Sequence, residues 1–401
     1  MEILEKLKNR LVSGIDISRD LSDEELNEII TALVLEEYQE RHLSLKEKLR
    51  ISRELFHAIR GLDVLQEILE DEEVTEIMVN GYNRIFIEKR GQLYRYPGVF
   101  TSADKLNDII QTIVARANKR VNEASPIVDT RLPDGSRVNI VLPPVALQGP
   151  VLTIRKFSRK AMKMEDLIAL GTISAEAAEF LRRLVIAGYN IFISGGTGSG
   201  KTTFLNALAG AIPKEERIIT IEDSAELKIK GIENLVSLEC RPANTEGENE
   251  ITIRDLIRTA LRMRPTRIIV GEVRGAETLD MLQAMNTGHD GSLSTGHGNS
   301  PADMLTRLET MVLMGTDMPL AAIRAQIASA LDIMVHLERF RDGSRKVVEI
   351  SAVLGFEEGA VRLSSLYLYH ERDEEMQRRT GRSSGQLTAT GNRLQRRKGT
   401  Y

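Results

Sequence analysis

A complete phosphate-binding loop lies near the middle of the chain, and no other feature of the sequence constrains the fold as much. Apolar residues 191–193 run into Ser194 and the motif GxxxxGKT, and an apolar helical stretch follows at 204–209. Such a loop turns its backbone N–H groups inward around a polyphosphate, in conformations that a Cβ would obstruct. A glycine-rich turn could match by chance, but the flanking strand and helix favour a true nucleotide site. Its expected residues are Gly195, Gly196, Thr197, Gly198, Ser199, Gly200, Lys201, Thr202 and Thr203.

Two side chains of this loop have specific expected roles. Lys201 can reach the β- and γ-phosphates of a nucleoside triphosphate, and the Thr202 hydroxyl can ligate Mg²⁺. The helix that begins here adds the positive end of its dipole. We therefore expect ATP and Mg²⁺ as cofactors.

Composition limits the remaining choices. A chain of 401 residues predicts two or three domains, and its net charge of −4 argues against a protein that coats nucleic acid. The lone Cys240 excludes an internal disulfide framework and fits a reducing compartment. No apolar run reaches the roughly 20 residues of a membrane helix, and the first residues lack a signal-peptide core. We expect a soluble chain that reaches membranes only through partners.

The first part of the chain changes its periodicity twice. Residues 1–60 are charged and helical in pattern, with a capping-box pair at Ser22 and Glu25. Residues 61–155 alternate β-type runs with one amphipathic helix near 103–118, which predicts an α+β domain. Residues 156–171 are predicted to form a linker with a short helix.

The second part reads as an α/β domain. Between 172 and 355, strands alternate with helices, which predicts a mostly parallel sheet covered on both faces. Residues 356–401 form a C-terminal extension, whose basic tail from Gln377 onward we expect to be disordered. The tail is either plain solvated chain or a contact for anionic lipid or nucleic acid.

Two acidic strand ends follow the phosphate loop. They lie at 220–226 and 268–275. In the one at 268–275, Gly271 stands where many NTPases carry an Asp, so Glu272 is the natural catalytic base. In the first, Glu222, Asp223 or Glu226 could organise Mg²⁺ and its waters. The alternative is that these are solvated strand-end acids. The residues expected around Mg²⁺ are Thr202, Glu222 and Glu272.

Two further groups have open interpretations. Arg254, Arg258 and Arg262 recur every four residues, so they share a helix face that is either solvated surface or a bridge to a neighbouring subunit's phosphates. His289 and His297 are eight residues apart, which is not metal spacing. His297 is either a sensor of the γ-phosphate or a structural histidine.

In their order, these motifs resemble the secretion ATPases of the type II/type IV superfamily, most closely the CpaF/TadA group that assembles tight-adherence (Flp) pili. One departure is Gly296, which stands where a bulkier apolar residue is usual before the histidine of the His box. The basic tail lies outside the family pattern. The likeness rests on the phosphate loop at 195–203, an aspartate box at 220–226, a Walker-B-like GEVRG at 271–275, the run 281–292, a His box at 294–300 and the stretch 128–155.

The resemblance implies an α/β fold: a RecA-like ATPase domain preceded by a PAS-like α+β domain and a helical segment. It also implies a ring homohexamer with nucleotide between the two domains. By this resemblance Glu272 is the catalytic acid, Glu222 and Glu226 belong to the aspartate box, and His297 lies near the γ-phosphate. Candidates for charge-stabilising contacts from the N-terminal domain are Arg131, Arg137 and Arg155.

The resemblance further implies a cytoplasmic motor, peripheral at the inner membrane, that pushes on pilus platform proteins without a specific nucleic-acid partner. A conjugative type IV secretion ATPase or an archaeal pilus or archaellum motor is the alternative within the superfamily. A RecA-like nucleic-acid motor is the alternative class, and net acidity disfavours it. A regulatory subunit without turnover is disfavoured by the intact Lys201 and Glu272.

Overall fold

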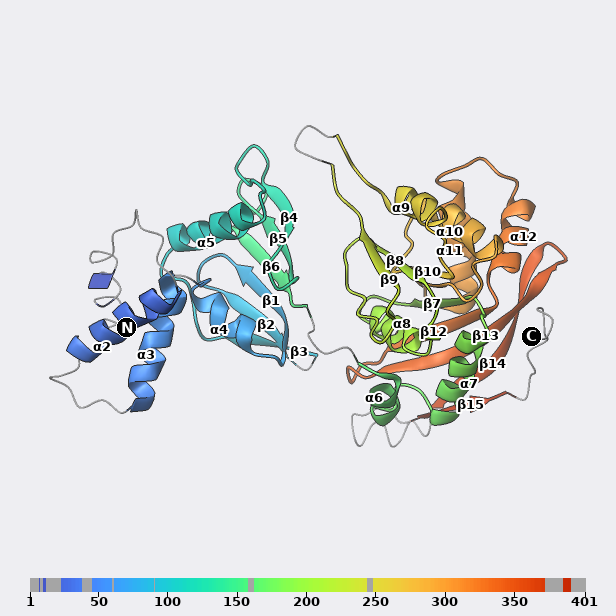
Figure 1. The fold of residues 1–401 in the computed structure, drawn as a ribbon, viewed down its shortest axis with the longest axis horizontal. Helices are drawn as coiled ribbons and strands as arrows, with labels where there is room; N and C mark the ends of the chain where they lie inside the picture. The colour runs from blue at the N-terminus through green and yellow to red at the C-terminus, as the bar shows by residue number, and fades with distance from the viewer. Residues whose placement is uncertain are drawn as a thin grey trace. The chain divides into compact units, whose positions relative to one another are not determined.

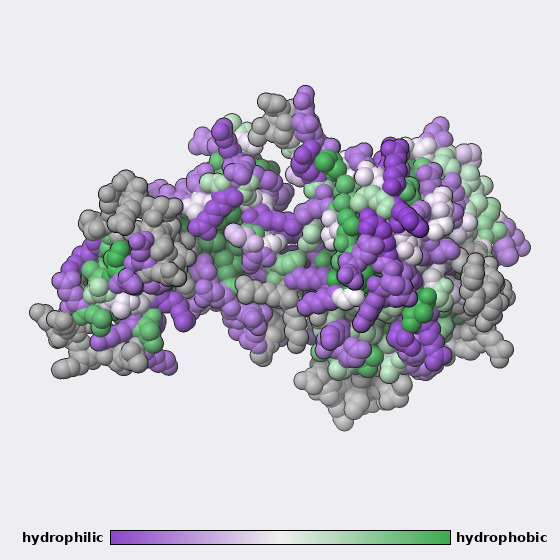
Figure 2. Space-filling model, in the orientation of Figure 1, coloured by the Kyte–Doolittle hydropathy of each residue, from purple (hydrophilic) through white to green (hydrophobic). Residues whose placement is uncertain are grey.

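The chain divides into two compact units, Met1–Arg159 and Lys160–Tyr401 (Figure 1). The face seen in Figure 2 is mostly hydrophilic, with hydrophobic residues in small separate patches. None of the helices in the described part of the chain has the length and apolar content needed to cross a membrane. This computed structural model describes residues 7, 10–11, 23–37, 45–59, 61–89, 91–157, 162–243, 248–371 and 385–390.

The first unit begins with helices α2 (Asp23–Glu37) and α3 (Leu45–Ile59). Apolar side chains of both helices, among them Leu26, Ile30 and Leu55, are buried in one small core. The two helices lie in the segment where the sequence predicts helices. Ser22 of the predicted capping box lies outside the described residues.

The rest of the first unit is a six-stranded antiparallel sheet in the order β3-β2-β1-β6-β5-β4. Helix α5 (Ala103–Arg116) buries its apolar stripe in the same core, and Ser102 caps its start by accepting from Lys105 N. Helix α4 covers Val64–Glu70. The strands are β1 (Val74–Asn80), β2 (Ile85–Lys89), β3 (Gln92–Tyr96), β4 (Ile127–Arg131), β5 (Arg137–Val141) and β6 (Val151–Arg155).

The second unit is built on a nine-stranded sheet of order β15-β14-β13-β12-β7-β11-β10-β8-β9. The strands from β12 to β9 in this order are parallel, as predicted, and β13, β14 and β15 continue the sheet in antiparallel pairs. The strands are β7 (Ile191–Gly195), β8 (Ile218–Glu222), β9 (Leu235–Glu239), β10 (Arg267–Val270), β11 (Leu293–His297), β12 (Ile333–Arg339), β13 (Arg345–Glu357), β14 (Ala360–Glu371) and β15 (Gly385–Ala389).

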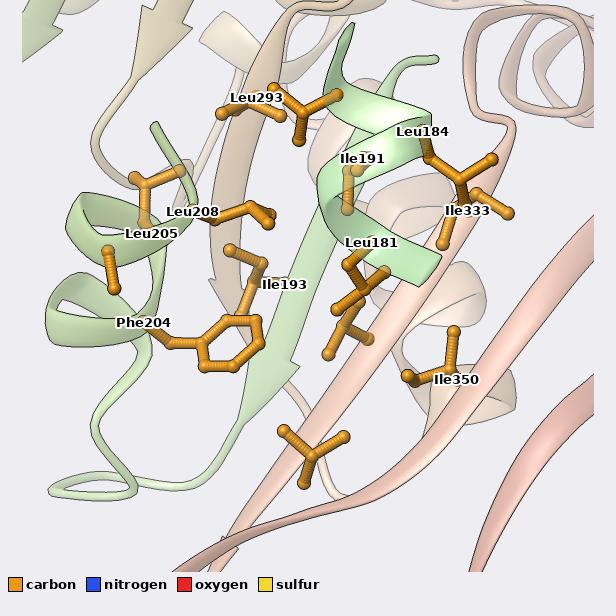
Figure 3. Close-up of a cluster of buried hydrophobic side chains, with 14 of the residues drawn as sticks. Leu181, Leu184, Ile191, Ile193, Phe204, Leu205, Leu208, Leu293, Ile333 and Ile350 are labelled. Carbon is orange, nitrogen blue, oxygen red and sulfur yellow. The ribbon is translucent and has the colours of Figure 1, made fainter. Parts of the chain in front are cut away.

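Helices cover the parallel part of this sheet on both faces (Figure 1). On one face, α7 and α8 pack onto β7, β12 and β13, and Figure 3 shows their buried side chains around Ile193, Phe204 and Ile333. On the other face, helices α9, α10, α11 and α12 bury their apolar side chains in a second core. The helices are α6 (Met164–Ala169), α7 (Ala175–Ile186), α8 (Lys201–Ala209), α9 (Ile253–Ala260), α10 (Glu277–Asn286), α11 (Pro301–Leu313) and α12 (Leu320–Ala330).

The structure differs from the sequence expectation at the C-terminal boundary. The sheet does not end near 355, because β13 reaches Glu357 and a two-residue turn with positive φ at Glu358 and Gly359 starts β14. Part of the expected disordered tail is also ordered: β15 pairs with β14 and buries Leu387. The basic residues that defined the tail lie outside the described residues, namely Arg378, Arg379, Arg382, Arg393, Arg396, Arg397 and Lys398.

Candidate active site

The phosphate loop follows β7, which is buried along its whole length between β11 and β12. Gly198 and Gly200 have φ of +70° and +93°, a region that residues with a Cβ rarely adopt. Gly200 is the N-cap of α8, so Lys201 and Thr202 lie in the first turn of that helix. The glycines therefore bend the chain from the sheet into the helix, as the motif predicts.

The Lys201 side chain is buried and lies across the loop. Its Nζ donates to the carbonyl oxygens of Gly195 at 3.1 Å and Gly196 at 2.9 Å. The Ser199 N–H lies 3.3 Å from the same Gly196 oxygen. An ammonium group and a backbone donor thus converge on one carbonyl oxygen of the loop, and both are donors that an anionic phosphate can accept from.

His297 connects this lysine to the predicted base. Its Nδ1 lies 3.2 Å from Lys201 Nζ, and its Nε2 lies 2.7 Å from Glu272 Oε1. Because an ammonium has only donors, Nδ1 accepts and the proton of the neutral ring is on Nε2. Burial lowers the pKa of His297, against the opposing effect of Glu272 and with the help of the Lys201 charge. His297 is therefore a neutral imidazole at neutral pH.

Glu272 follows β10 and is held by an ion pair. Arg274 Nη2 lies 2.9 Å from Glu272 Oε2, and Arg274 Nη1 lies 3.8 Å from Asp223 Oδ2. The hydrogen bond to Glu272 raises the pKa of Arg274. Glu272 Oε1 is buried, and within the described residues it accepts no hydrogen bond of good geometry, although His297 Nε2 is close.

Glu222, at the end of β8, is held by backbone N–H groups. Its side chain is buried, and its Oε1 accepts from Glu226 N at 2.9 Å and from Leu227 N at 3.0 Å. A Cβ on Gly271 would lie 2.9 Å from Glu222 Cγ. The Glu222 side chain thus lies against Gly271 and fixes the backbone of the aspartate box. Asp223, the next residue, is exposed.

The residues predicted around Mg²⁺ carry oxygen donors. Thr202 supplies a hydroxyl, and Glu272 and Glu222 supply carboxylates, which are the hard ligands that Mg²⁺ prefers. Within the described residues no group of three or more His, Cys, Asp and Glu side chains could hold a metal ion. Mg²⁺ commonly takes one or two carboxylates together with substrate phosphates and waters, so Thr202 and Glu272 fit it by their chemistry, whereas Glu222 Oε1 is already held by two backbone N–H groups.

The three candidate arginines of the first unit form one row across its sheet. Arg131 lies opposite Arg137, and Arg137 lies opposite Arg155, on the neighbouring strands β4, β5 and β6. Residues directly opposite each other share a face, so three cationic side chains are brought together. Glu76 of β1 comes next, opposite Arg155.

The arginine face of α9 has partners inside the unit. Arg254 Nε lies 2.8 Å from Asp280 Oδ2, and Arg258 Nε lies 2.9 Å from Asp280 Oδ1. A capping box formed by Thr252 and Asp255 begins this helix. Two of the three arginines therefore tie α9 to α10, which the sequence pattern did not indicate.

Sequence reasoning missed His336, which lies beside the strand that leads into the loop. Its ring is buried, its Nδ1 is 2.9 Å from Ser194 Oγ, and it hydrogen-bonds to the backbone of Asn299, two residues after His297. Burial lowers the pKa of His336, so its ring is neutral. The pairing of β12 with β7 creates this contact over 142 residues of sequence, and no local motif signals it.

Comparison with known proteins agrees with this geometry. A model of the type II/IV secretion system protein family matches residues 60–393. A putative conjugal transfer protein of Mycobacterium tuberculosis is 37% identical over 315 residues, covering 77% of this chain and 89% of that protein. The type IV secretion system protein PtlH of Bordetella pertussis is 36% identical over 317 residues, covering 72% and 93%.

Among solved structures, the Legionella pneumophila ATPase DotB aligns with a TM-score of 0.53 over 73% of this chain and 79% of that one. At 22% identity this likeness concerns the fold, and the α/β architecture with its RecA-like sheet is as predicted. The family match covers most of the chain and includes every motif of the site. This chain belongs to the type II/IV secretion system protein family.

Proposed function

We propose that this chain is an ATP-hydrolysing motor that works as a homohexamer at the cytoplasmic face of the inner membrane. In this proposal it acts on platform proteins of the membrane to assemble a pilus of the tight-adherence type. The observation that carries the ATPase part is the contact chain from Lys201 through His297 to Glu272, which joins three segments of one sheet edge.

Each side chain has a task in hydrolysis. Lys201 binds the β- and γ-phosphates, and its charge balances the negative charge that develops on the γ-phosphate. The Glu272 carboxylate orients the attacking water and takes its proton. His297, neutral and joined to both, is placed to respond when Lys201 turns toward phosphate. When bound beside Thr202, Mg²⁺ would add charge stabilisation to the phosphates.

The arginine row supports a second source of positive charge. Arg131, Arg137 and Arg155 lie together on one face of the first unit's sheet, as an anion-binding surface requires. We propose that they contact the nucleotide's phosphates, as the family resemblance implies.

A second candidate is an ATPase for conjugation or type IV secretion. It is favoured by the names of the relatives, which are a conjugal transfer protein and a type IV secretion system protein. Deleting the gene and measuring both surface pili and conjugal or effector transfer separates the two. Loss of pili with transfer intact supports the tight-adherence function, and the reverse result supports the alternative.

Two substitutions test the ATPase chemistry. Lys201→Ala should weaken ATP binding by about tenfold or more, since a buried charged donor to phosphate is lost. Glu272→Gln should keep ATP binding and lower kcat by about 10²–10⁴-fold, as expected for loss of a general base. Binding is measured with a fluorescent ATP analogue and turnover by phosphate release. Glu165→Gln, on the exposed side of α6, is the control. Wild-type turnover by Glu272→Gln would remove Glu272 from the mechanism, and ATPase activity that requires DNA would favour a nucleic-acid motor.

A further inference from the structure

The hairpin between β12 and β13 runs along the outer side of the phosphate loop. Strand β12 pairs with β7 as far as Leu337 opposite Gly195. The chain then turns, with Phe340 N donating to Ser344 O and Gly343 N donating to Phe340 O, and β13 returns from Arg345. The hairpin therefore continues beyond the end of β7, alongside the loop.

Arg345 contacts the loop directly from this hairpin. Its Nε donates to the carbonyl oxygen of Gly198 at 2.8 Å. A Cβ built on Gly200 would lie 3.2 Å from Arg345 Cδ, and one built on Gly198 would lie 3.4 Å from an Arg339 Nη. The two glycines thus serve a second purpose: they let arginine side chains pack against the loop's outer side.

This contact sets the direction of one peptide group. In a planar trans peptide, the C=O of Gly198 and the N–H of Ser199 point in opposite directions. With the carbonyl turned outward to Arg345, the Ser199 N–H points inward, where it lies 3.3 Å from Gly196 O. Lys201 Nζ donates to that same oxygen at 2.9 Å. Arg345 thus orients a backbone donor toward the same oxygen that the lysine ammonium contacts.

We propose that Arg345 is a positioning residue for the phosphates of the bound nucleotide, an inference that rests on the proposed ATP binding. It acts through the Gly198–Ser199 peptide rather than by touching phosphate. A guanidinium suits this role because its N–H groups have fixed directions, whereas the lysine ammonium rotates freely on a flexible stem.

The test compares Arg345→Ala and Arg345→Lys with Arg341→Ala in the full-length chain. Arg341 is an exposed arginine at the turn of the same hairpin and serves as the control for charge. Binding of a fluorescent ATP analogue is measured directly, and ADP and inorganic tripolyphosphate are used as competitors. Thermal unfolding without nucleotide reports on the fold.

Arg345→Ala should weaken binding of ATP, ADP and tripolyphosphate by the same factor, about tenfold, as expected for losing one charge-assisted hydrogen bond. Arg345→Lys should recover part of the loss, because its ammonium can still donate to the Gly198 carbonyl. Arg341→Ala should bind as the wild type does, and the unfolding temperature of all three variants should match it.

Three results would overturn the role of Arg345. The first is unchanged affinity in Arg345→Ala, the second is equal loss in Arg341→Ala, and the third is a loss for ATP without a loss for tripolyphosphate. A fall in unfolding temperature that accounts for the weaker binding also counts against it. If the wild type binds no nucleotide, the proposed function fails together with this inference. If the wild type binds and hydrolyses ATP, only the role of Arg345 is in question.

Discussion

Gly271 stands where many NTPases carry an aspartate, and the neighbouring Glu222 gives the physical reason. The Glu222 side chain comes from β8, the strand beside β10, and lies in the space that a side chain at 271 would need. Two backbone N–H groups of the aspartate box hold its Oε1. A carboxylate is therefore present beside this strand end, but it comes from the adjacent strand.

Gly271→Ala tests this packing. The added Cβ would lie 2.9 Å from Glu222 Cγ, so Glu222 must move and release the backbone of Glu226 and Leu227. We expect the free energy of unfolding to fall by about 1–3 kcal/mol and kcat to fall more than ATP affinity. Urea unfolding and phosphate release measure the two effects. Adding Glu222→Asp, which shortens the side chain, should recover part of the stability; no recovery would mean that the clash is elsewhere.

The protonation of His297 should set a lower pH limit for ATP turnover. The groups that act on it are Glu272, Lys201, Arg274 and Arg307, and burial outweighs Glu272 to lower the pKa of His297 below 6.5. The unfolded chain therefore binds the proton first, so this group's stabilising contribution is lost as pH falls below about 6.5. Protonation also turns Nδ1 into a donor that faces Lys201.

We expect ATP turnover to fall on the acidic side of pH 6.5, the ordinary pKa of histidine, because the protonated ring repels Lys201. His297→Gln should have lower turnover at neutral pH and a flatter acidic limb. The measurement is kcat between pH 5 and 8 for both proteins. An acidic limb of the same shape in His297→Gln would assign the titration to another group.

Individual residues differ in how far the sequence predicts them. The phosphate loop, Glu272 and His297 could be predicted because each lies in a local motif whose chemistry is specific, and the structure brings Lys201, His297 and Glu272 into contact. Glu222 was predicted near Mg²⁺, and only the structure shows its use as a backbone acceptor. His336 and Arg345 could not be found, since each depends on the pairing of β12 with β7 and on its hairpin partner β13.

At the scale of elements, the row of arginines across β4, β5 and β6 is a feature that register alone creates. The sequence gives three separate arginines, and only the pairing places Arg137 between the other two. A one-residue slip of β5 would send its side chain to the opposite face. The β-type runs predicted in this part of the chain are present, but the pairing of β5 with β6 could not be inferred from spacing.

Arg137→Gln removes the central charge of this row. If the row contacts the nucleotide as proposed, ATP turnover should fall by about tenfold, because the phosphates would lose one charge-assisted contact, while the free energy of unfolding should change by less than about 1 kcal/mol. Arg95→Gln on β3 of the same sheet, where Arg95 is exposed opposite Phe86, is the control. Phosphate release and urea unfolding are the measurements. Equal turnover in both variants would exclude the row from the site.

The C-terminal elements show where local patterns give least information. The alternating apolar residues of β13 and β14 indicate strands. The turn between them, Glu358–Gly359, is a weaker sequence signal for a hairpin than Asn-Gly or Asp-Gly. Strand β15 is short, polar and preceded by a basic stretch, so composition indicated disorder. Its pairing with β14 and the burial of Leu387 depend on a sheet that the rest of the unit provides.

At the scale of the whole molecule, the proposed function requires assembly. We expect native mass spectrometry with ATPγS and Mg²⁺ to show six copies of the chain, and Glu272→Gln to hold the same state in ATP because it binds without turnover. Lys201→Ala should assemble less, since it binds nucleotide weakly. A wild-type chain that stays monomeric in all nucleotide states would contradict the ring mechanism.

The central place of β7 also has a consequence for biosynthesis. Ile191 pairs with Leu293 on one side and with Ile333 on the other, so the strand that leads into the phosphate loop gains its neighbours only after much later segments are made. Pairings so distant in sequence form slowly. A nascent chain released by the ribosome before Ile333 should therefore bind no nucleotide, although the whole GxxxxGKT motif has been translated. Retention of staged truncations on immobilised ATP would mark when during synthesis the site first exists.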